Sequence, residues 1–229
     1  MIGPTRYADR AEAGRALAEE ILRTLDPSLL GGRDELDPSP GVVGPVVLAL
    51  PRGGVPVAAP LAQALGVAVS VLVVRKLGAP GEPELAIGAL AAIGDRIEQV
   101  INTDLIRRLG LSEHRMSRLV ERETALLRDR VAVFGSAPPV AGRAVILVDD
   151  GLATGATMRV AVTAVRRAGA SYVVAAAPVG ASAACQELER LADDVVCPLR
   201  PEPFRAVGEH YVDFTQTTDS EVLEVLGRS

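Results

Sequence analysis

The chain has 229 residues, 48% of them hydrophobic and 23% charged, and it carries a formal net charge of −5 at pH 7. This length and composition suit one well-buried α/β domain with a small appendage. The sequence has neither a signal-like N-terminus nor an apolar run of the ~20 residues that a membrane span requires, so we expect a cytoplasmic protein with no membrane partner. The excess of acidic residues argues against nucleic acid as a partner.

The first predicted element is an amphipathic helix that begins near Asp9. Its small and apolar residues recur at helical spacing, at Gly14, Leu17, Ala18, Ile21, Leu22 and Leu25. The following residues, 31–45, are rich in Gly, Pro and Asp. We expect them to form a surface loop and not a linker between domains, because the single helix before them cannot form a core of its own.

The second predicted unit is a strand, a glycine-containing turn and a helix. The apolar run Val46–Leu50 leads to Arg52, Gly53 and Gly54, and a helical stretch continues to Leu65. A guanidinium beside two glycines offers several hydrogen-bond donors to a multiply charged anion, and the glycines let the main chain approach it. Taken alone, the pattern also fits an ordinary strand-to-helix turn with a surface arginine.

The third unit starts with the apolar run Val69–Val74 and continues into Arg75 and Lys76. Glycines and prolines then predict a mobile loop with a basic start; they are Gly78, Pro80, Gly81 and Pro83. A solvated strand end explains the two basic residues equally well. Strands over 86–93 and 97–101 are predicted to pair around a Gly-Asp turn.

A charged helical region follows, over residues 107–130, with Asn102 and Ser112 as candidate N-caps. Basic and acidic side chains alternate along it, which predicts a solvated amphipathic helix. A nucleic-acid-binding face is the alternative, and the interspersed acids disfavour it.

The stretch from Val145 to Met158 is the most informative part of the chain. An apolar strand over 145–148 ends at Asp149 and Asp150, where ligands of open α/β sheets gather. Small residues then precede a helix that starts near Ala156, and its unpaired N–H groups suit a phosphate. The two carboxylates suit sugar hydroxyls or Mg²⁺. Together they predict a site for a ribose 5-phosphate.

The rest of the chain continues the alternation, with a strand over 172–177, a helix over 182–191 and a strand over 194–197. Such alternation predicts a parallel sheet covered by helices. Cys185 and Cys197 are expected to be buried thiols, not a disulfide or metal pair. The tail holds three of the six aromatic residues, Phe204, Tyr211 and Phe214, which either stack on a nucleobase or pack the tail onto the sheet.

The segment Val145–Met158 resembles the 5-phosphoribosyl 1-diphosphate (PRPP) motif of the type I phosphoribosyltransferases, and Leu48–Val57 resembles their pyrophosphate loop. The resemblance implies one α/β domain over 1–229, with a mostly parallel twisted sheet flanked by helices. Its core is expected at about 42–198, and a small variable hood at 1–30 and 199–229.

The resemblance also implies roles for individual residues. Asp149 and Asp150 would bind the ribose hydroxyls and Mg²⁺, directly or through water. The other PRPP-binding residues would be Gly53, Gly54, Gly151, Ala153, Thr154, Gly155, Ala156 and Thr157. Arg52, after a cis peptide bond from Pro51, would bind the diphosphate. Arg75 and Lys76 would reach it from the loop, and Glu82 or Glu84 would act as an acid on the base.

The implied reaction is transfer of the 5-phosphoribosyl group from PRPP to a small nitrogenous base, with release of pyrophosphate. Hypoxanthine and guanine enzymes carry an aspartate where this chain has Ala153, and the ATG sequence is closer to that of adenine enzymes, so a purine-like base is favoured. A homodimer is expected from the family. The alternatives are a non-catalytic PRPP- or nucleotide-sensing regulator on the same fold and an enzyme that makes PRPP, although no nucleotide loop for the latter is recognisable.

Overall fold

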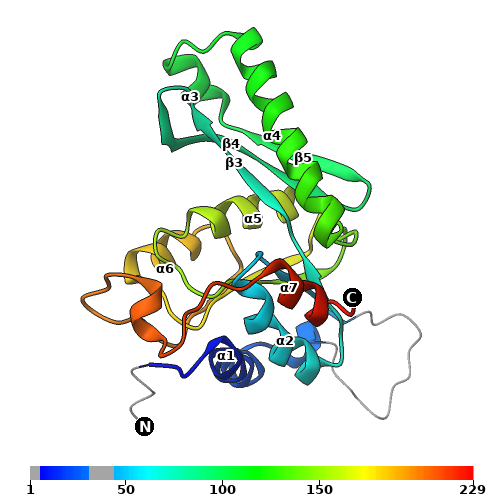
Figure 1. Cartoon of the computed structure of the whole chain (residues 1–229), viewed down its shortest axis with the longest axis vertical. Helices are drawn as coiled ribbons and strands as arrows, with labels where there is room; N and C mark the ends of the chain where they lie inside the picture. Colours follow the sequence, from blue (N-terminus) through cyan, green and yellow to red (C-terminus); the bar gives the residue numbers. More distant parts are fainter. Residues whose placement is uncertain (1–5, 31–43, 229) are drawn as a thin grey trace.

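A five-stranded parallel sheet forms the centre of the protein, in a computed structural model that describes residues 6–30 and 44–228 (Figure 1). Its strand order is β2-β1-β6-β7-β8. The strands are β1 (Val46–Ala49), β2 (Val69–Val71), β6 (Ala144–Val148), β7 (Tyr172–Ala176) and β8 (Asp194–Val196). The apolar runs predicted this parallel sheet, because a strand that is covered on both faces carries apolar residues throughout and does not alternate between apolar and polar residues.

Helices cover both faces of the sheet (Figure 1). On one face, α1 (Arg10–Thr24) and α2 (Gly54–Leu65) pack in a core with Val47 and Ile146. On the other, α5 (Ala156–Arg167) and α6 (Ser182–Leu188) lie over alternate residues of the same strands, in a core with Leu48 and Leu147. The helix after β1 and the helix after β6 therefore lie on opposite faces, which follows from right-handed crossovers running in opposite directions from these two strands.

A second, three-stranded antiparallel sheet stands apart from the first, in the order β3-β4-β5 (Figure 1). Its strands are β3 (Val74–Ala79), β4 (Glu82–Ile93) and β5 (Arg96–Ile101), and α3 (Thr103–Arg108) and α4 (Glu113–Phe134) follow them. The predicted pairing of the last two strands around Gly94 and Asp95 is confirmed.

The prediction of a mobile loop after Lys76 was wrong. This segment forms a β-hairpin that turns at Pro80 and Gly81, with register shifts on either side of Gly78. The alternation of buried Leu77 and Ala79 holds the strand in place. Glycine and proline by themselves favour a loop, but in this segment they form a bulge and a turn within paired strands.

The predicted helix starts are confirmed at three places. Asp9 caps α1 by accepting a hydrogen bond from the Glu12 amide, and Asn102 and Ser112 cap α3 and α4 in the same way. Some details differ, since Leu22 is 46% exposed. The helix predicted over 182–191 ends at Leu188. Most of the loop predicted over 31–45 lies outside the described residues.

Both terminal segments pack against each other. Three short helices complete the fold: η1 (Pro27–Leu30), η2 (Val207–His210) and α7 (Asp219–Val225). The Tyr7 amide donates to the carbonyl of His210, and the Val212 amide donates to the carbonyl of Tyr7.

Among residues 6–30 and 44–228, no helix is long and apolar enough to cross a membrane. The division into a core and a terminal hood stays a prediction. The separate antiparallel sheet is a further part of the fold that this division did not include.

Candidate active site at the ends of strands β1 and β6

The site lies where the connections from β1 and β6 leave the sheet side by side. The two strands are parallel neighbours, with Ala49 opposite Val148, and their following helices turn to opposite faces. This arrangement opens a crevice beyond the carboxyl ends of the strands, where open α/β sheets bind ligands. The chain places Arg52 and its two glycines on one side of the crevice and the acid pair Asp149 and Asp150 on the other.

The two connections approach so closely that a Cβ at either of two glycines would clash with the neighbouring connection. A Cβ on Gly53 would lie 1.9 Å from Oδ2 of Asp150, and a Cβ on Gly54 would lie 2.4 Å from the carbonyl oxygen of Val148. The peptide bond between Pro51 and Arg52 is cis, as the resemblance implied. Glycine at positions 53 and 54 therefore allows contact between two loops that are far apart in the chain.

The acid pair is half-buried and electrostatically strained. Burial and the neighbouring charge of Asp150 raise the pKa of Asp149 to about 8. The hydrogen bond from the Asp150 amide and the charge of Arg10 lower this pKa, but by less. That amide donates to Oδ1 of Asp149 at 2.9 Å. Two adjacent carboxylates held in this way will bind groups that supply hydrogen bonds or positive charge, such as sugar hydroxyls or a cation.

Arg10 is a site residue that the sequence analysis missed. Its Nε donates to Oδ2 of Asp150 at 2.9 Å, and its Nη1 donates to the carbonyl of Thr215 at 2.7 Å. The guanidinium also lies 4.0 Å from the ring centroid of Phe214. Arg10 thus joins the first helix, the acid pair and the C-terminal tail. The sequence predicted the helix that carries Arg10, but nothing in its spacing indicates a partner 140 residues away.

Residues 151–157 wrap around a small cavity at the start of α5. Gly155 has a φ of 66° and is the N-cap of the helix, a left-handed conformation that favours glycine. The cavity has a volume of about 140 Å³ and is lined by Asp149, Gly151, Leu152, Ala153, Thr154, Gly155, Ala156, Thr157 and Met158. A pocket of small residues at a helix N-terminus suits an anion such as a phosphate monoester.

Gly151 is covered by η2, since a Cβ at this position would lie 2.4 Å from a methyl group of Val207. The hydroxyl of Tyr211 donates to the carbonyl of Asp150 at 2.6 Å. The tail therefore packs directly onto the loop that follows β6.

Arg52 has a partner that the sequence did not indicate. Its guanidinium lies 3.4 Å from Oδ1 of Asp219, at the start of α7. Asp219 is held more closely by Arg130, with two contacts of 3.0 Å. Both side chains of the Arg52 pair are about one-third exposed, at 32% and 39%, so the pair is weak and Arg52 remains within reach of an anion in the crevice.

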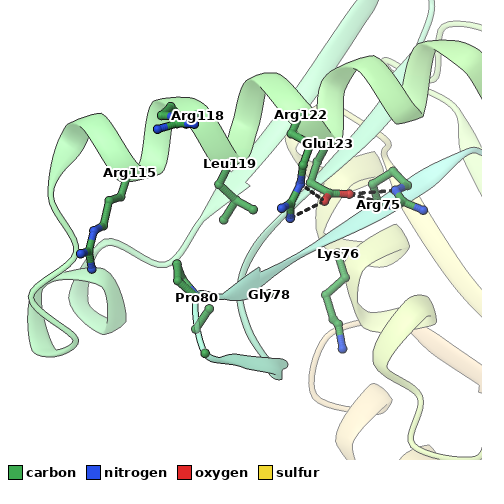
Figure 2. Close-up of a pocket in the computed structure, with 11 residues that line it drawn as sticks. Arg75, Lys76, Gly78, Pro80, Arg115, Arg118, Leu119, Arg122 and Glu123 are labelled. Carbon is green, nitrogen blue, oxygen red and sulfur yellow. Dashed lines mark hydrogen bonds and ion pairs between the residues drawn. The ribbon is translucent and has the colours of Figure 1, made fainter.

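The structure places Arg75 and Lys76 in a different cavity from the acid pair. They line a groove between the β3–β4 hairpin and α4 (Figure 2). Arg75 donates to Oε2 of Glu123 at 2.7 Å. Of the two candidate glutamates in this segment, Glu82 is exposed, and the side chain of Glu84 lies outside the part of the chain that the structure describes.

The aromatic residues of the tail pack against rings of the protein itself. Tyr211 is 1% exposed and packs at 5.9 Å from Tyr7 and 5.0 Å from Phe214, between ring centroids. Phe204 stacks on His210 at 5.7 Å. The sequence analysis left two roles open for these aromatic residues, stacking on a nucleobase or packing the tail onto the fold. Tyr211 packs the tail onto the fold, whereas Phe204 and Phe214 keep part of their surface exposed.

A Mg²⁺ ion would find a partial ligand set in the site. Among the described residues, no group of three or more His, Cys, Asp and Glu side chains is arranged to hold a metal. Mg²⁺ is usually bound by one or two carboxylates, with waters and substrate phosphates completing its shell. Asp149 and Asp150 fit that donor set once a phosphorylated ligand supplies the remaining oxygens.

Comparisons with known proteins agree with this geometry. A family model described as the phosphoribosyl transferase domain matches residues 9–213. Two strains of Mycobacterium tuberculosis, CDC 1551 and H37Rv, have a relative that is 40% identical over 226 residues, and its name assigns it provisionally to the phosphoribosyl transferases. The match covers 97% of this chain and 47% of the relative, so the chain spans about half the length of that relative.

Among solved structures, the protein TT1426 from Thermus thermophilus is similar over 96% of this chain and 97% of its own, with 37% identity and a TM-score of 0.76. A purine phosphoribosyltransferase from Pyrococcus horikoshii is 16% identical, with a TM-score of 0.39 over 83% of this chain and 80% of its own. A similarity that low carries no information about the base.

Proposed function

The chain belongs to the phosphoribosyl transferase family, and on that premise we propose that it transfers the 5-phosphoribosyl group of PRPP to a nitrogenous base, with release of pyrophosphate. The observation that supports this most directly is the contact between Gly53 and the Asp150 carboxylate. It puts donors for a diphosphate and acceptors for a diol in one crevice, with a phosphate-sized cavity beside them. A ribose carrying phosphates at both ends needs these three features together.

In the proposed mechanism, the protein mainly positions and stabilises charge. The carboxylates of Asp149 and Asp150 accept hydrogen bonds from the two ribose hydroxyls, and the amides around Gly155 hold the 5-phosphate. Arg52 and the main chain of Gly53 face the diphosphate, where negative charge develops as the bond to C1 breaks. Asp149 and Asp150 would hold a Mg²⁺ ion, which would supply positive charge that offsets part of this negative charge. No protein nucleophile is required, and positioning supplies much of the rate enhancement.

Arg75, Lys76 and Glu84 keep the roles that the resemblance implies. The two basic residues would contact the diphosphate and the glutamate would act on the base. For Arg75 this role requires its guanidinium to exchange Glu123 for a phosphate oxygen. A purine-like base, a homodimer and a cytoplasmic location belong to the same proposal and rest on the family. A PRPP- or nucleotide-sensing regulator remains the second candidate.

The test is pyrophosphate release from PRPP with Mg²⁺ across a panel of nucleobases. Turnover with one base supports the transferase, whereas tight PRPP binding without any turnover supports the sensor. The double variant Asp149→Asn with Asp150→Asn should abolish PRPP binding in calorimetry while the protein stays folded. A matched control, Asp95→Asn with Asp129→Asn, removes the same charge from exposed positions and should bind PRPP normally. Unchanged affinity in the first variant would contradict the assignment of the acid pair.

A further inference from the structure

The two cysteines of the chain lie close together in the folded protein. Both are buried thiols, as the sequence predicted. Cys185 lies on α6, and Cys197 directly follows β8. A Cβ on Gly180 would lie 3.2 Å from Sγ of Cys185 and 3.1 Å from Sγ of Cys197. The two sulfurs therefore flank the same glycine, although they come from different elements of the fold.

The two thiols also interact with each other. The Cys197 thiol has two hydrogen-bond acceptors within reach, the carbonyl of Leu199 at 3.5 Å and the sulfur of Cys185. The hydrogen bond between the thiols lowers the pKa of Cys185 and raises the pKa of Cys197, and the charge of Arg200 favours a thiolate at either sulfur. The pair thus loses its first proton more readily than an isolated cysteine does, and shares the second.

Solvent reaches one of the two sulfurs. Cys197 is 8% exposed, whereas Cys185 is 0% exposed. Cys197 and Arg200 line a cavity of about 440 Å³ between the end of α1 and β8. Arg200 is held there by Glu189, whose Oε1 accepts from its Nη1 at 2.9 Å. A molecule little larger than water can therefore meet the Cys197 sulfur beside a fixed positive charge, which stabilises a thiolate.

We propose that Cys185 and Cys197 form a redox site, at which hydrogen peroxide converts the two thiols into a reversible disulfide. The Cys197 thiolate attacks one peroxide oxygen, the O–O bond breaks, and hydroxide leaves with the electron pair and takes up the proton that Cys197 lost. The Cys185 sulfur then attacks the resulting sulfenic acid, the S–O bond breaks, and the hydroxyl group leaves as water with the Cys185 proton. Two thiols are oxidised, and one peroxide is reduced to two waters.

The redox site is in contact with the loop that follows β6. A Cβ on Gly180 would also lie 2.9 Å from Cβ of Leu152, a residue that lines the cavity at the start of α5. The Leu152 amide donates to the carbonyl of Val179 at 2.9 Å, and the Ala181 amide donates to the carbonyl of Leu152 at 2.8 Å. A covalent bond brings two sulfurs closer than a contact between thiols does, so oxidation should displace this loop and weaken PRPP binding. That consequence rests on the proposed function, whereas the redox site does not.

The first experiment treats the reduced full chain with hydrogen peroxide and follows its free thiols and intact mass. Because the chain has two cysteines, any disulfide within one chain joins Cys185 to Cys197. We expect loss of both thiols together with the mass of two hydrogen atoms, and dithiothreitol should reverse both changes. Unreacted thiols, oxidation to sulfinic acid without a disulfide, or disulfides formed only between chains would overturn the proposal.

Single variants then test the role of each sulfur. In Cys185→Ser the second step cannot occur, so dimedone should trap a sulfenic acid on Cys197. Cys197→Ser keeps only the buried sulfur and should react at least about tenfold more slowly than the wild type. Equal reaction rates in the wild type and both variants would show that the pair does not act together, against the proposal.

A matched pair of variants tests the positive charge. Arg200→Gln should slow the loss of thiols severalfold, because it removes the charge beside Cys197. Arg190→Gln removes the same charge from an exposed position that does not line the cavity and should react like the wild type. Equal slowing in both variants would contradict the role of Arg200.

Calorimetry with PRPP tests the link to the loop. The disulfide form should bind PRPP about fivefold more weakly or less, at the lower end of typical couplings between sites, and dithiothreitol should restore the affinity. Equal affinity of the two forms would overturn the link. If the reduced chain fails to bind PRPP at all, the proposed function is contradicted, and the thiol measurements still decide the redox site.

Discussion

Replacing Gly53 with alanine tests the contact between the two loops on which the site depends. Gly53 has φ −60° and ψ −31°, an ordinary helical conformation that alanine adopts without strain. The added methyl group would lie 1.9 Å from Oδ2 and 2.5 Å from Cγ of Asp150. Any effect of the substitution is therefore steric and acts through the Asp150 carboxylate.

The size of the effect follows from what the carboxylate must give up. To reach an ordinary contact distance, Oδ2 has to move by more than about 1 Å, which breaks its 2.9 Å ion pair with Arg10. The side chains of that pair are only 11% and 18% exposed, so separating them leaves charge partly buried. Adding the usual penalty for overpacking, we expect a loss of about 2–4 kcal/mol in the free energy of unfolding, together with loss of PRPP binding.

Urea denaturation measures the stability and calorimetry measures PRPP affinity. Gly44→Ala is the control, because the nearest atom to its new methyl group is a side-chain carbon of Val67 at 3.3 Å. A double variant, Gly53→Ala with Asp150→Ala, removes the clashing oxygen and should be no less stable than Asp150→Ala alone. Wild-type stability and wild-type PRPP affinity in Gly53→Ala would refute the reasoning, and so would simple additivity in the double variant.

Two further predictions concern Glu123, which binds Arg75 beside α4, and Tyr211, which binds the loop after β6. The lowered pKa of Glu123 contributes stability that is present above its unfolded pKa of about 4.3 and is lost as pH falls through the folded pKa. The variant Glu123→Gln should therefore lose less stability than the wild type between about pH 5 and 3, in acid titrations followed by circular dichroism. Parallel unfolding curves for the two proteins would contradict this prediction. Tyr211→Phe removes the 2.6 Å hydrogen bond to the carbonyl of Asp150 and should cost about 1–2 kcal/mol in urea denaturation at pH 7, whereas a change within experimental error would mean that this bond is dispensable.

The strand–loop–helix units of the site were predictable because their signals are local. The apolar runs before Arg52 and before Asp149 indicated both strands of the crevice, since a strand buried on both faces needs several apolar residues in succession. Glycines and small residues then marked where the main chain turns into a helix. The same local reasoning failed after Lys76, where glycine and proline occur inside a hairpin that long-range pairing stabilises.

The amino-acid sequence by itself determined the parallel α/β architecture, the capped helix starts and the two loops that carry the candidate ligand-binding groups. Only the tertiary structure decided which side chains complete them: Arg10 is 140 residues from Asp150, Asp219 is 167 residues from Arg52, and Arg75 is 48 residues from Glu123. Hydrophobic periodicity specifies which face of an element is buried, but it does not specify which polar residue of another element arrives at its end. Those pairings depend on the packing of whole helices and strands, so they emerge only when the chain is folded.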